Sequence, residues 1–215
     1  ILDRNQGMVD RIFMMEGYTP LSLQRIYPPV KDFDRACDLL NAKFRLVVDE
    51  SSRYMNLAPS NTYLPRAFFV YNSTVIRNED SVRAFMMNPN FEPRSIAVFE
   101  DDPHFNVDGI ADGGNATITS YSLNKISLIT ETKKNGFLML SEIFYPGWVA
   151  YIDGTPSPVL RANWSLRAVP VKSGKHEIVL RFEPESFRMG AWITLLTILS
   201  SSAVIIFIRF KKKNK

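Results

Sequence analysis

The sequence predicts an α+β protein in which a small α/β unit is followed by an antiparallel β-sandwich and one C-terminal transmembrane helix. Helix and strand patterns alternate over residues 1–102. Short strand patterns separated by turn residues follow over residues 116–187. An apolar run fills most of residues 188–208. A linker over residues 103–115 and a basic tail over residues 209–215 complete the predicted organisation.

The apolar run is long enough to cross a bilayer. Residues 189–208 carry no formal charge, and a helix of that length, at about 1.5 Å per residue, spans a hydrocarbon core of roughly 30 Å. Trp192 near one end suits the headgroup level, and cationic side chains follow the other end, as expected of a cytoplasmic flank. A buried helix of a soluble protein is the alternative, but such a helix is usually shorter and is not followed by a basic run at the chain end. The residues expected at the membrane interface are Arg188, Trp192, Arg209, Lys211, Lys212 and Lys213.

The positive net charge of the chain belongs to this basic tail. Five of the 26 Lys and Arg residues follow Ile208, so the rest of the chain, with 21 cationic and 22 acidic side chains, is close to neutral. The charge therefore does not predict nucleic-acid binding, and the tail instead suits the negative inner leaflet of a membrane. Cys37 is the only cysteine, so no intrachain disulfide can form and packing must hold the domains together.

The basic flank predicts that the rest of the chain lies outside the cytoplasm. Residues 1–7 have neither the cationic start nor the apolar core of a signal peptide. Since a domain outside the cytoplasm needs an export signal, either such a signal has been removed or transmembrane segments lie upstream. We interpret the chain as the C-terminal piece of a longer membrane protein.

The α/β unit is predicted from three helical patterns and three strand patterns. Thr19 can cap a short helix that opens at Pro20, and Asn78 can cap another. An apolar face indicates a helix between these two. Residues 50–64 are polar and are expected to form a loop or a sheet edge. The predicted helices cover residues 20–27, 32–42 and 79–87, and the predicted strands cover residues 44–48, 65–71 and 95–99.

The sandwich is predicted from short strand patterns joined by turn pairs such as Asn135-Gly136. In the last pattern Ile178 and Leu180 alternate with polar residues, as in a strand that is buried on one face. Such strands at close spacing indicate an antiparallel sandwich, which must lie close to the membrane because so few residues separate it from the apolar run. The predicted strands cover residues 117–123, 125–132, 137–144, 148–152, 165–171 and 176–182.

The stretches with the most distinctive residues are 140–154, 161–170 and 174–184, and three further marker stretches, 16–21, 39–44 and 65–68, lie upstream. Taken together and in order, these stretches closely resemble the C-terminal region of the bacterial YfhO family of multi-spanning membrane proteins. The resemblance implies a GT-C-type glycosyltransferase of the cell envelope. Such an enzyme takes sugar from a polyprenyl-phosphate carrier on the outer side of the membrane and adds it to a cell-surface polymer such as lipoteichoic acid. The catalytic acidic residue of the family is expected in an early extracytoplasmic loop upstream of this chain, so the resemblance implies no catalytic residue here.

Two aromatic residues are candidates for contact with a sugar. In Tyr145-Pro-Gly-Trp148, Pro and Gly turn the chain between two strands, while Tyr145 and Trp148 offer flat apolar faces. Such faces pack against a sugar ring or fill the end of a sandwich, and the sequence leaves both roles open.

A second group of candidates combines planar donors with an aromatic ring. Such a group could recognise a phosphate or a polymer oxygen, or its arginines could pair across strands with Glu142 or Asp153. These two carboxylates could also form an acid and base pair, but they lie on different predicted strands with nothing to bring them together. The candidates are Arg161, Asn163, Trp164 and Arg167.

Other chemistry has little support in the sequence. His104 and His176 are far apart and have no Cys or acidic residue at ligand spacing, so no metal site is predicted. The chain has no glycine-rich phosphate loop, and no cofactor is predicted. The partners expected are the lipid bilayer, the upstream transmembrane bundle, and a cell-surface glycopolymer or lipid-linked sugar. A membrane-tethered carbohydrate-binding or structural module without catalysis is the alternative function.

Overall fold

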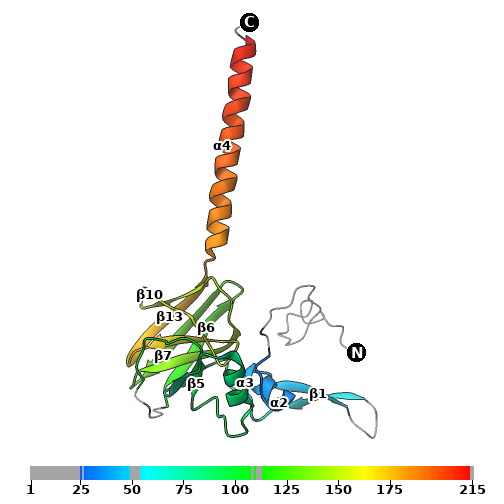
Figure 1. Cartoon of the computed structure of the whole chain (residues 1–215), viewed down its shortest axis with the longest axis vertical. Coiled ribbons are helices and arrows are strands. Elements are labelled where there is room, and N and C mark those ends of the chain that lie inside the picture. The colour runs from blue at the N-terminus through cyan, green and yellow to red at the C-terminus, as the bar shows by residue number, and fades with distance from the viewer. Residues whose placement is uncertain (1–24, 26, 49–53, 108, 110–112, 214–215) are drawn as a thin grey trace.

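The computed structural model contains two packed β-sheets, a projecting hairpin and a long C-terminal helix (Figure 1). The helix predicted over residues 20–27 and the end of the basic tail fall largely outside the described residues. The structure describes residues 25, 27–48, 54–107, 109 and 113–213.

One layer of the sandwich is an antiparallel sheet, here called sheet I, whose described strands follow the order β10-β9-β13-β7-β6. β13 lies in its middle and pairs with β7 and β9. Ile178 and Leu180 of β13 are fully buried, which confirms the predicted alternation. The strands are β6 (Asn115–Ser122), β7 (Lys125–Thr132), β9 (Trp148–Ile152), β10 (Thr155–Ser157) and β13 (Gly174–Phe182).

The other layer, sheet II, joins strands from both halves of the chain in the order β3-β8-β12-β11-β5-β4. All of its described pairings are antiparallel except β4 with β5. Phe69 of β3 faces the core between the sheets, whereas Phe68 and Val70 face the other side of sheet II. The strands are β3 (Ala67–Val70), β4 (Ser73–Val75), β5 (Ala97–Phe99), β8 (Gly136–Ile143), β11 (Leu160–Ala162) and β12 (Leu166–Val171).

β3, β4 and β5 therefore complete the sandwich that is predicted over residues 116–187. The sequence pattern predicts these strands as part of a separate α/β unit over residues 1–102. β3 is buried along its whole length. A strand that is apolar on both faces needs cover on both sides and a neighbour that completes its hydrogen bonds. β8 supplies that neighbour, with Ala67 opposite Leu140 and Val70 opposite Phe137.

Two helices cover sheet II, and each begins at a side-chain cap. In α2 (Phe33–Leu39), the N–H of Arg35 donates to Asp32 Oδ1 over 2.7 Å. In α3 (Glu79–Met87), the N–H of Ser81 donates to Asn78 Oδ1 over 3.1 Å, so the predicted cap and bounds are confirmed. α2 is shorter than the helix predicted over residues 32–42, and Phe33 in its first turn is 59% exposed.

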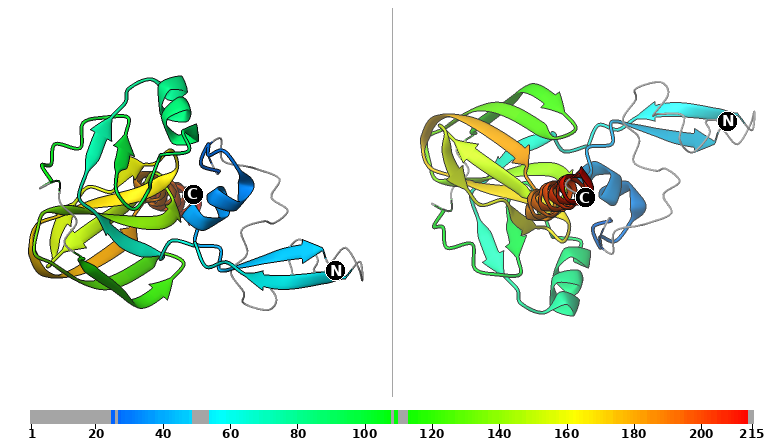
Figure 2. Two further views of the ribbon diagram at one scale, coloured as in Figure 1. Left: turned by 90° about the horizontal axis from the view of Figure 1, so that it is seen from below. Right: turned by 90° about the horizontal axis from the view of Figure 1, so that it is seen from above.

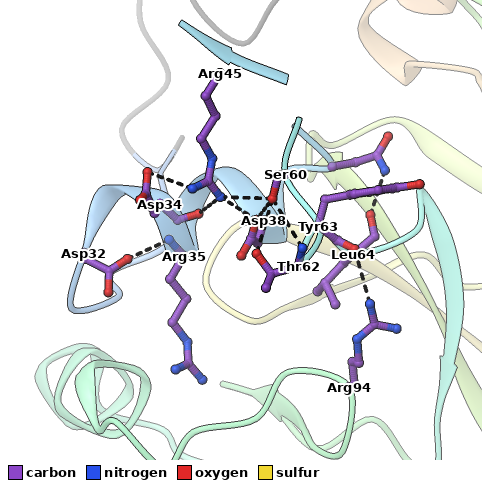
Figure 3. A network of polar contacts seen from close by, with 11 residues as sticks. Asp32, Asp34, Arg35, Asp38, Arg45, Ser60, Thr62, Tyr63, Leu64 and Arg94 are labelled. Atoms are coloured by element: carbon purple, nitrogen blue, oxygen red, sulfur yellow. Dashed lines mark hydrogen bonds and ion pairs between the residues drawn. The ribbon is translucent and has the colours of Figure 1, made fainter. Parts of the chain in front are cut away.

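A hairpin of β1 (Phe44–Val48) and β2 (Met55–Pro59) projects away from the sandwich, as both views in Figure 2 show. Its base is held to α2 by Arg45, which forms ion pairs of 2.9 Å with Asp34 and 2.6 Å with Asp38. The hydroxyl of Ser60 donates to the same Asp38 carboxylate over 2.9 Å (Figure 3). The polar stretch predicted as a loop or an edge thus contains β2, the partner of β1.

α4 (Glu185–Lys213) leaves one end of the sandwich and runs away from it (Figure 1). It is long and apolar enough to cross a membrane, and its most apolar part is not buried against the rest of the described chain. Only Glu183 and Pro184 separate it from β13.

We predict that the buried hydroxyl of Tyr71 stabilises the junction between the two sheets. It lies 2.8 Å from Thr132 Oγ1 and accepts the N–H of Gly114 over 3.0 Å. Because Tyr71→Phe leaves these groups short of a partner, it should lower the free energy of unfolding by about 1–3 kcal/mol. Urea unfolding of the full chain in detergent micelles, followed by tryptophan fluorescence, measures this. Tyr145→Phe, which alters a half-exposed side chain, is the matched control, and equal losses in the two variants would contradict the assignment.

Candidate functional site

The residues singled out in the sequence divide between two sets of contacts. Arg167 of β12 points to the interior side of sheet II, where it meets Trp148 of sheet I. Trp164, at the turn before β12, packs with α3 in a separate apolar cluster. The six candidates therefore do not form one site.

The first set surrounds Arg167, which is only 6% exposed. Its guanidinium lies 4.1 Å from the centroid of the Trp148 ring, and its Nε donates to the carbonyl of Ile143 over 3.0 Å. Its Nη1 is buried and has no hydrogen-bond partner in the structure. Burial lowers the pKa of Arg167, and the charge of Glu142 offsets part of this effect.

Glu142 of β8, whose charge acts on Arg167, also contacts Arg66 and Tyr121. Its Oε1 accepts a hydrogen bond of 3.0 Å from Arg66 and another of 2.8 Å from the hydroxyl of Tyr121. The Arg66 guanidinium also lies 4.9 Å from the centroid of the Tyr121 ring. Burial first, and then the charge of Glu142, raise the pKa of Tyr121 to about 12, so its hydroxyl stays protonated and acts as a donor. We call Arg66, Tyr121, Glu142, Trp148 and Arg167 the Glu142 cluster.

The Glu142 cluster lies at the end of the sandwich from which α4 leaves. Trp148 stands opposite Phe182, the last residue of β13, and their ring centroids are 5.6 Å apart. Tyr145 is 48% exposed, and its ring centroid lies 6.1 Å from that of Phe182. Since Arg167 and Phe182 occupy the surroundings of Trp148, Tyr145 offers the more accessible aromatic surface.

Arg66 and Tyr121 were missed as candidate site residues. They are distant in sequence from Glu142, by 76 and 21 positions. The stretch over residues 65–68, which carries the family resemblance, contained the only signal for Arg66.

The second set of contacts is structural. The Asn163 side chain is fully buried, and its Oδ1 accepts the N–H of Val98 over 2.8 Å, while the backbone N–H of Asn163 donates to the carbonyl of Val98 over 2.8 Å. Trp164 is 5% exposed, and the guanidiniums of Arg25 and Arg83 lie 4.3 Å and 4.7 Å from its ring centroid. Both Asn163 and Trp164 adopt positive φ, at 45° and 77°. A bulky residue keeps such a conformation only where its surroundings hold it.

Arg161 completes this second set, with its Nε 3.5 Å from a carboxylate oxygen of Glu100. Glu100 also pairs with Arg25. Arg161 therefore pairs with Glu100 and not with Glu142 or Asp153, the two partners that the sequence leaves open, whereas the charge of Glu142 does act on Arg167. The ion pair of Glu142 is with Arg66.

Asp153 lies in the turn after β9, at the opposite end of that strand from Trp148. Its Oδ2 lies 2.7 Å from Nδ1 of His176, and its Oδ1 accepts the N–H of Glu177 over 2.9 Å. Asp153 and Glu142 thus belong to different ends of the sandwich and do not form a carboxylate pair. Among the described residues, no group of three or more His, Cys, Asp and Glu is placed to hold a metal ion.

The predicted interface residues lie along α4. Arg188 and Trp192 are exposed near its start, and Arg209, Lys211 and Lys212 are exposed near its end. Trp192 and Arg209 are about 26 Å apart along an ideal helix, close to the thickness of a hydrocarbon core. The side chain of Lys213 falls outside the described residues.

We predict that ionised Asp153 stabilises the protein and that this stabilisation is lost at acidic pH. The hydrogen bond from His176, followed by the one from the Glu177 N–H, lowers the pKa of Asp153. A carboxyl group whose pKa is lower in the folded state stabilises the fold above its unfolded pKa, and this contribution is lost as pH falls through the folded pKa. The difference in melting temperature between the native chain and Asp153→Asn should therefore be largest near neutral pH and shrink below about pH 4. A difference that stays constant between pH 7 and pH 3 would contradict this role.

We predict that Asn163 contributes to stability, unlike its neighbour Arg161. Asn163→Ala removes the acceptor of the buried Val98 N–H and should cost about 3 kcal/mol. Arg161→Ala removes a partly exposed ion pair and should cost about 0.5 kcal/mol. Urea unfolding of both variants measures the contrast, and equal losses would show that the buried amide of Asn163 is not a structural contact.

Comparison with known proteins finds similarity to bacterial membrane proteins. Residues 111–194 match the family described as Bacterial membrane protein YfhO. A protein of Bacillus subtilis (strain 168), described as Uncharacterized protein YfhO, is 23% identical over 124 residues, which are 57% of this chain and 14% of that protein. No solved structure matches the chain. The matched residues contain strands of both sheets and the start of α4, so this part of the chain is similar to the YfhO family of bacterial membrane proteins.

Proposed function

We propose that this chain is the C-terminal extracytoplasmic part and last membrane span of a bacterial envelope glycosyltransferase. The complete enzyme would take a sugar from a polyprenyl-phosphate carrier on the outer side of the membrane. It would transfer that sugar to a cell-surface polymer such as lipoteichoic acid. The chemical step belongs to the upstream membrane bundle, and the sandwich contacts the phosphate-bearing sugar or polymer.

The observation that carries this proposal is the position of the Glu142 cluster at the end of the sandwich beside α4. Two guanidiniums, from Arg66 and Arg167, face one carboxylate, from Glu142, so the cluster keeps a net positive charge. A net positive charge favours a phosphate group. Tyr145 adds an exposed ring beside the cluster, which suits the apolar face of a sugar.

The position of the cluster also suits a substrate that is held in a bilayer. A polyprenyl chain stays in the hydrocarbon core, so its phosphate and sugar lie at the membrane surface. Trp148 of the cluster packs against Phe182, and only Glu183 and Pro184 lie between Phe182 and α4. A sugar phosphate at the membrane surface would therefore lie close to Tyr145.

The burial of Asn163 and Trp164 indicates that these two candidate residues stabilise the fold and do not contact a ligand. This is the specific observation behind the second candidate function, a membrane-tethered carbohydrate-binding or structural module without catalysis. The two functions differ in whether the longer protein transfers sugar.

We predict that Tyr145 contributes to binding of a polyprenyl-phosphate hexose. The full chain is reconstituted in phosphatidylcholine vesicles that contain the lipid-linked sugar, and binding is followed by tryptophan fluorescence. Tyr145→Ser should weaken binding by roughly tenfold because an aromatic contact is lost. Tyr54→Ser, which alters an exposed tyrosine beside the hairpin, is the matched control. Equal affinities of both variants would contradict the site, and binding of glycerol phosphate polymer instead of the lipid-linked sugar would identify the acceptor as its ligand.

We also predict that this chain alone transfers no sugar in vesicles supplied with the lipid-linked donor and acceptor polymer. A longer family member should transfer it, and deletion of the segment that corresponds to this chain should lower the rate. Turnover by the chain alone would contradict the assignment of catalysis to the upstream bundle. Absence of transfer by the longer protein would favour the module without catalysis.

A further inference from the structure

Two loops of sheet I and its neighbours are bonded to the chain just before α4 begins. The N–H of Phe182 donates to the carbonyl of Asn124, in the turn between β6 and β7, over 3.0 Å. The N–H of Glu183 donates to the carbonyl of Gly147, in the loop between β8 and β9, over 2.7 Å. Both loops are therefore fixed at the base of α4.

Each of these loops presents an apolar side chain to solvent. Leu123, beside Asn124 in the β6–β7 turn, is 91% exposed. Tyr145, in the loop before β9, is 48% exposed, and Phe187 in the first turn of α4 is 75% exposed. We call Leu123, Tyr145 and Phe187 the apolar collar, because they come from three segments that meet at the base of α4.

The length of α4 sets how far this collar lies from the bilayer. The uncharged run begins at Met189, and from there to Glu185 an α-helix rises about 6 Å. The polar headgroup layer on each side of a bilayer is about 5–8 Å thick. If the uncharged run fills the hydrocarbon core, the headgroup layer therefore reaches the first residues of α4.

The side chains around the collar suit the same surface. Lys125, Arg181 and Arg188 are exposed close to it. Lys and Arg beside apolar and aromatic side chains are typical of the membrane interface, where the apolar parts enter the headgroup layer and the charges stay with the phosphates.

We propose that the apolar collar inserts into the lipid headgroup layer, so that the sandwich is seated on the membrane at three points instead of hanging from α4 alone. The occupant of this surface is the bilayer itself. Continuity with α4 argues for this occupant, because any bilayer that α4 crosses must reach the level at which the collar begins. The inference does not depend on the proposed glycosyltransferase function or on which side of the membrane the sandwich lies.

Seating at three points fixes the tilt of the sandwich and α4 relative to the bilayer. A helix alone leaves that tilt free, whereas Leu123 and Tyr145, on two different loops, define the face that contacts the membrane. The face that they define contains the edge of the Glu142 cluster, since Tyr145 packs with Phe182 and Phe182 packs with Trp148.

The test places a fluorescent label at the Leu123 position. In a Cys37→Ala background, Leu123→Cys is labelled with an environment-sensitive fluorophore, and the full chain is reconstituted in vesicles of phosphatidylcholine and phosphatidylglycerol. Part of the phosphatidylcholine carries a nitroxide on its headgroup, which quenches labels in the headgroup layer. Lys133→Cys is the matched control, because Lys133 is exposed in the turn at the opposite end of β7.

We expect the label at position 123 to be quenched at least about twofold more than the label at position 133, and to be less accessible to aqueous iodide. Equal quenching at the two positions would overturn the inference. Equal access of iodide to both labels would also overturn it, whatever the activity of the longer protein. Circular dichroism of both labelled variants shows that each comparison is made on the folded chain.

Discussion

The short connection between β13 and α4 is the constraint on which the rest of the structure depends. β13 is held on both sides in sheet I, and only Glu183 and Pro184 separate it from the helix. The N–H groups of Phe182 and Glu183, which a flexible linker would leave to solvent, are both bonded to neighbouring loops. Since the helix cannot swing freely from the strand, the fold determines which end of the sandwich lies beside α4.

That end holds the Glu142 cluster, and sheet II explains why only half of the candidate residues belong to it. Successive side chains of a strand point to opposite faces. On β12, Arg167 therefore points toward sheet I and Trp148, while Leu166 and Ala168 point to the outer core. Asn163 and Trp164, in the turn before β12, hold β5 and α3 instead. Residues 161–167, which the sequence suggests as one recognition motif, thus contribute partly to the Glu142 cluster and partly to the packing of β5 and α3.

Much of the local structure could be predicted because it follows from short-range patterns. The cap at Asn78, the alternation in β13 and the uncharged run of α4 are all set by neighbouring residues. The pairing of β3 with β8 could not be predicted, because it joins residues about 70 positions apart. It also depends on which strand edge of the folded sheet remains unpaired. Strands of three residues, such as β10 and β11, are too short to show a period. The pairing of Arg66 with Glu142 was missed for the same reason as the pairing of their strands.

Hydrogen exchange at the junction of the sandwich and α4 measures whether the two form one rigid unit. The amides of Phe182 and Glu183 should exchange as slowly as that of Leu180 in the middle of β13 when the chain is reconstituted in lipid nanodiscs and followed by NMR. Exchange at the rate of an unstructured peptide at positions 182 and 183, with Leu180 still protected, would show a flexible hinge and would contradict the account.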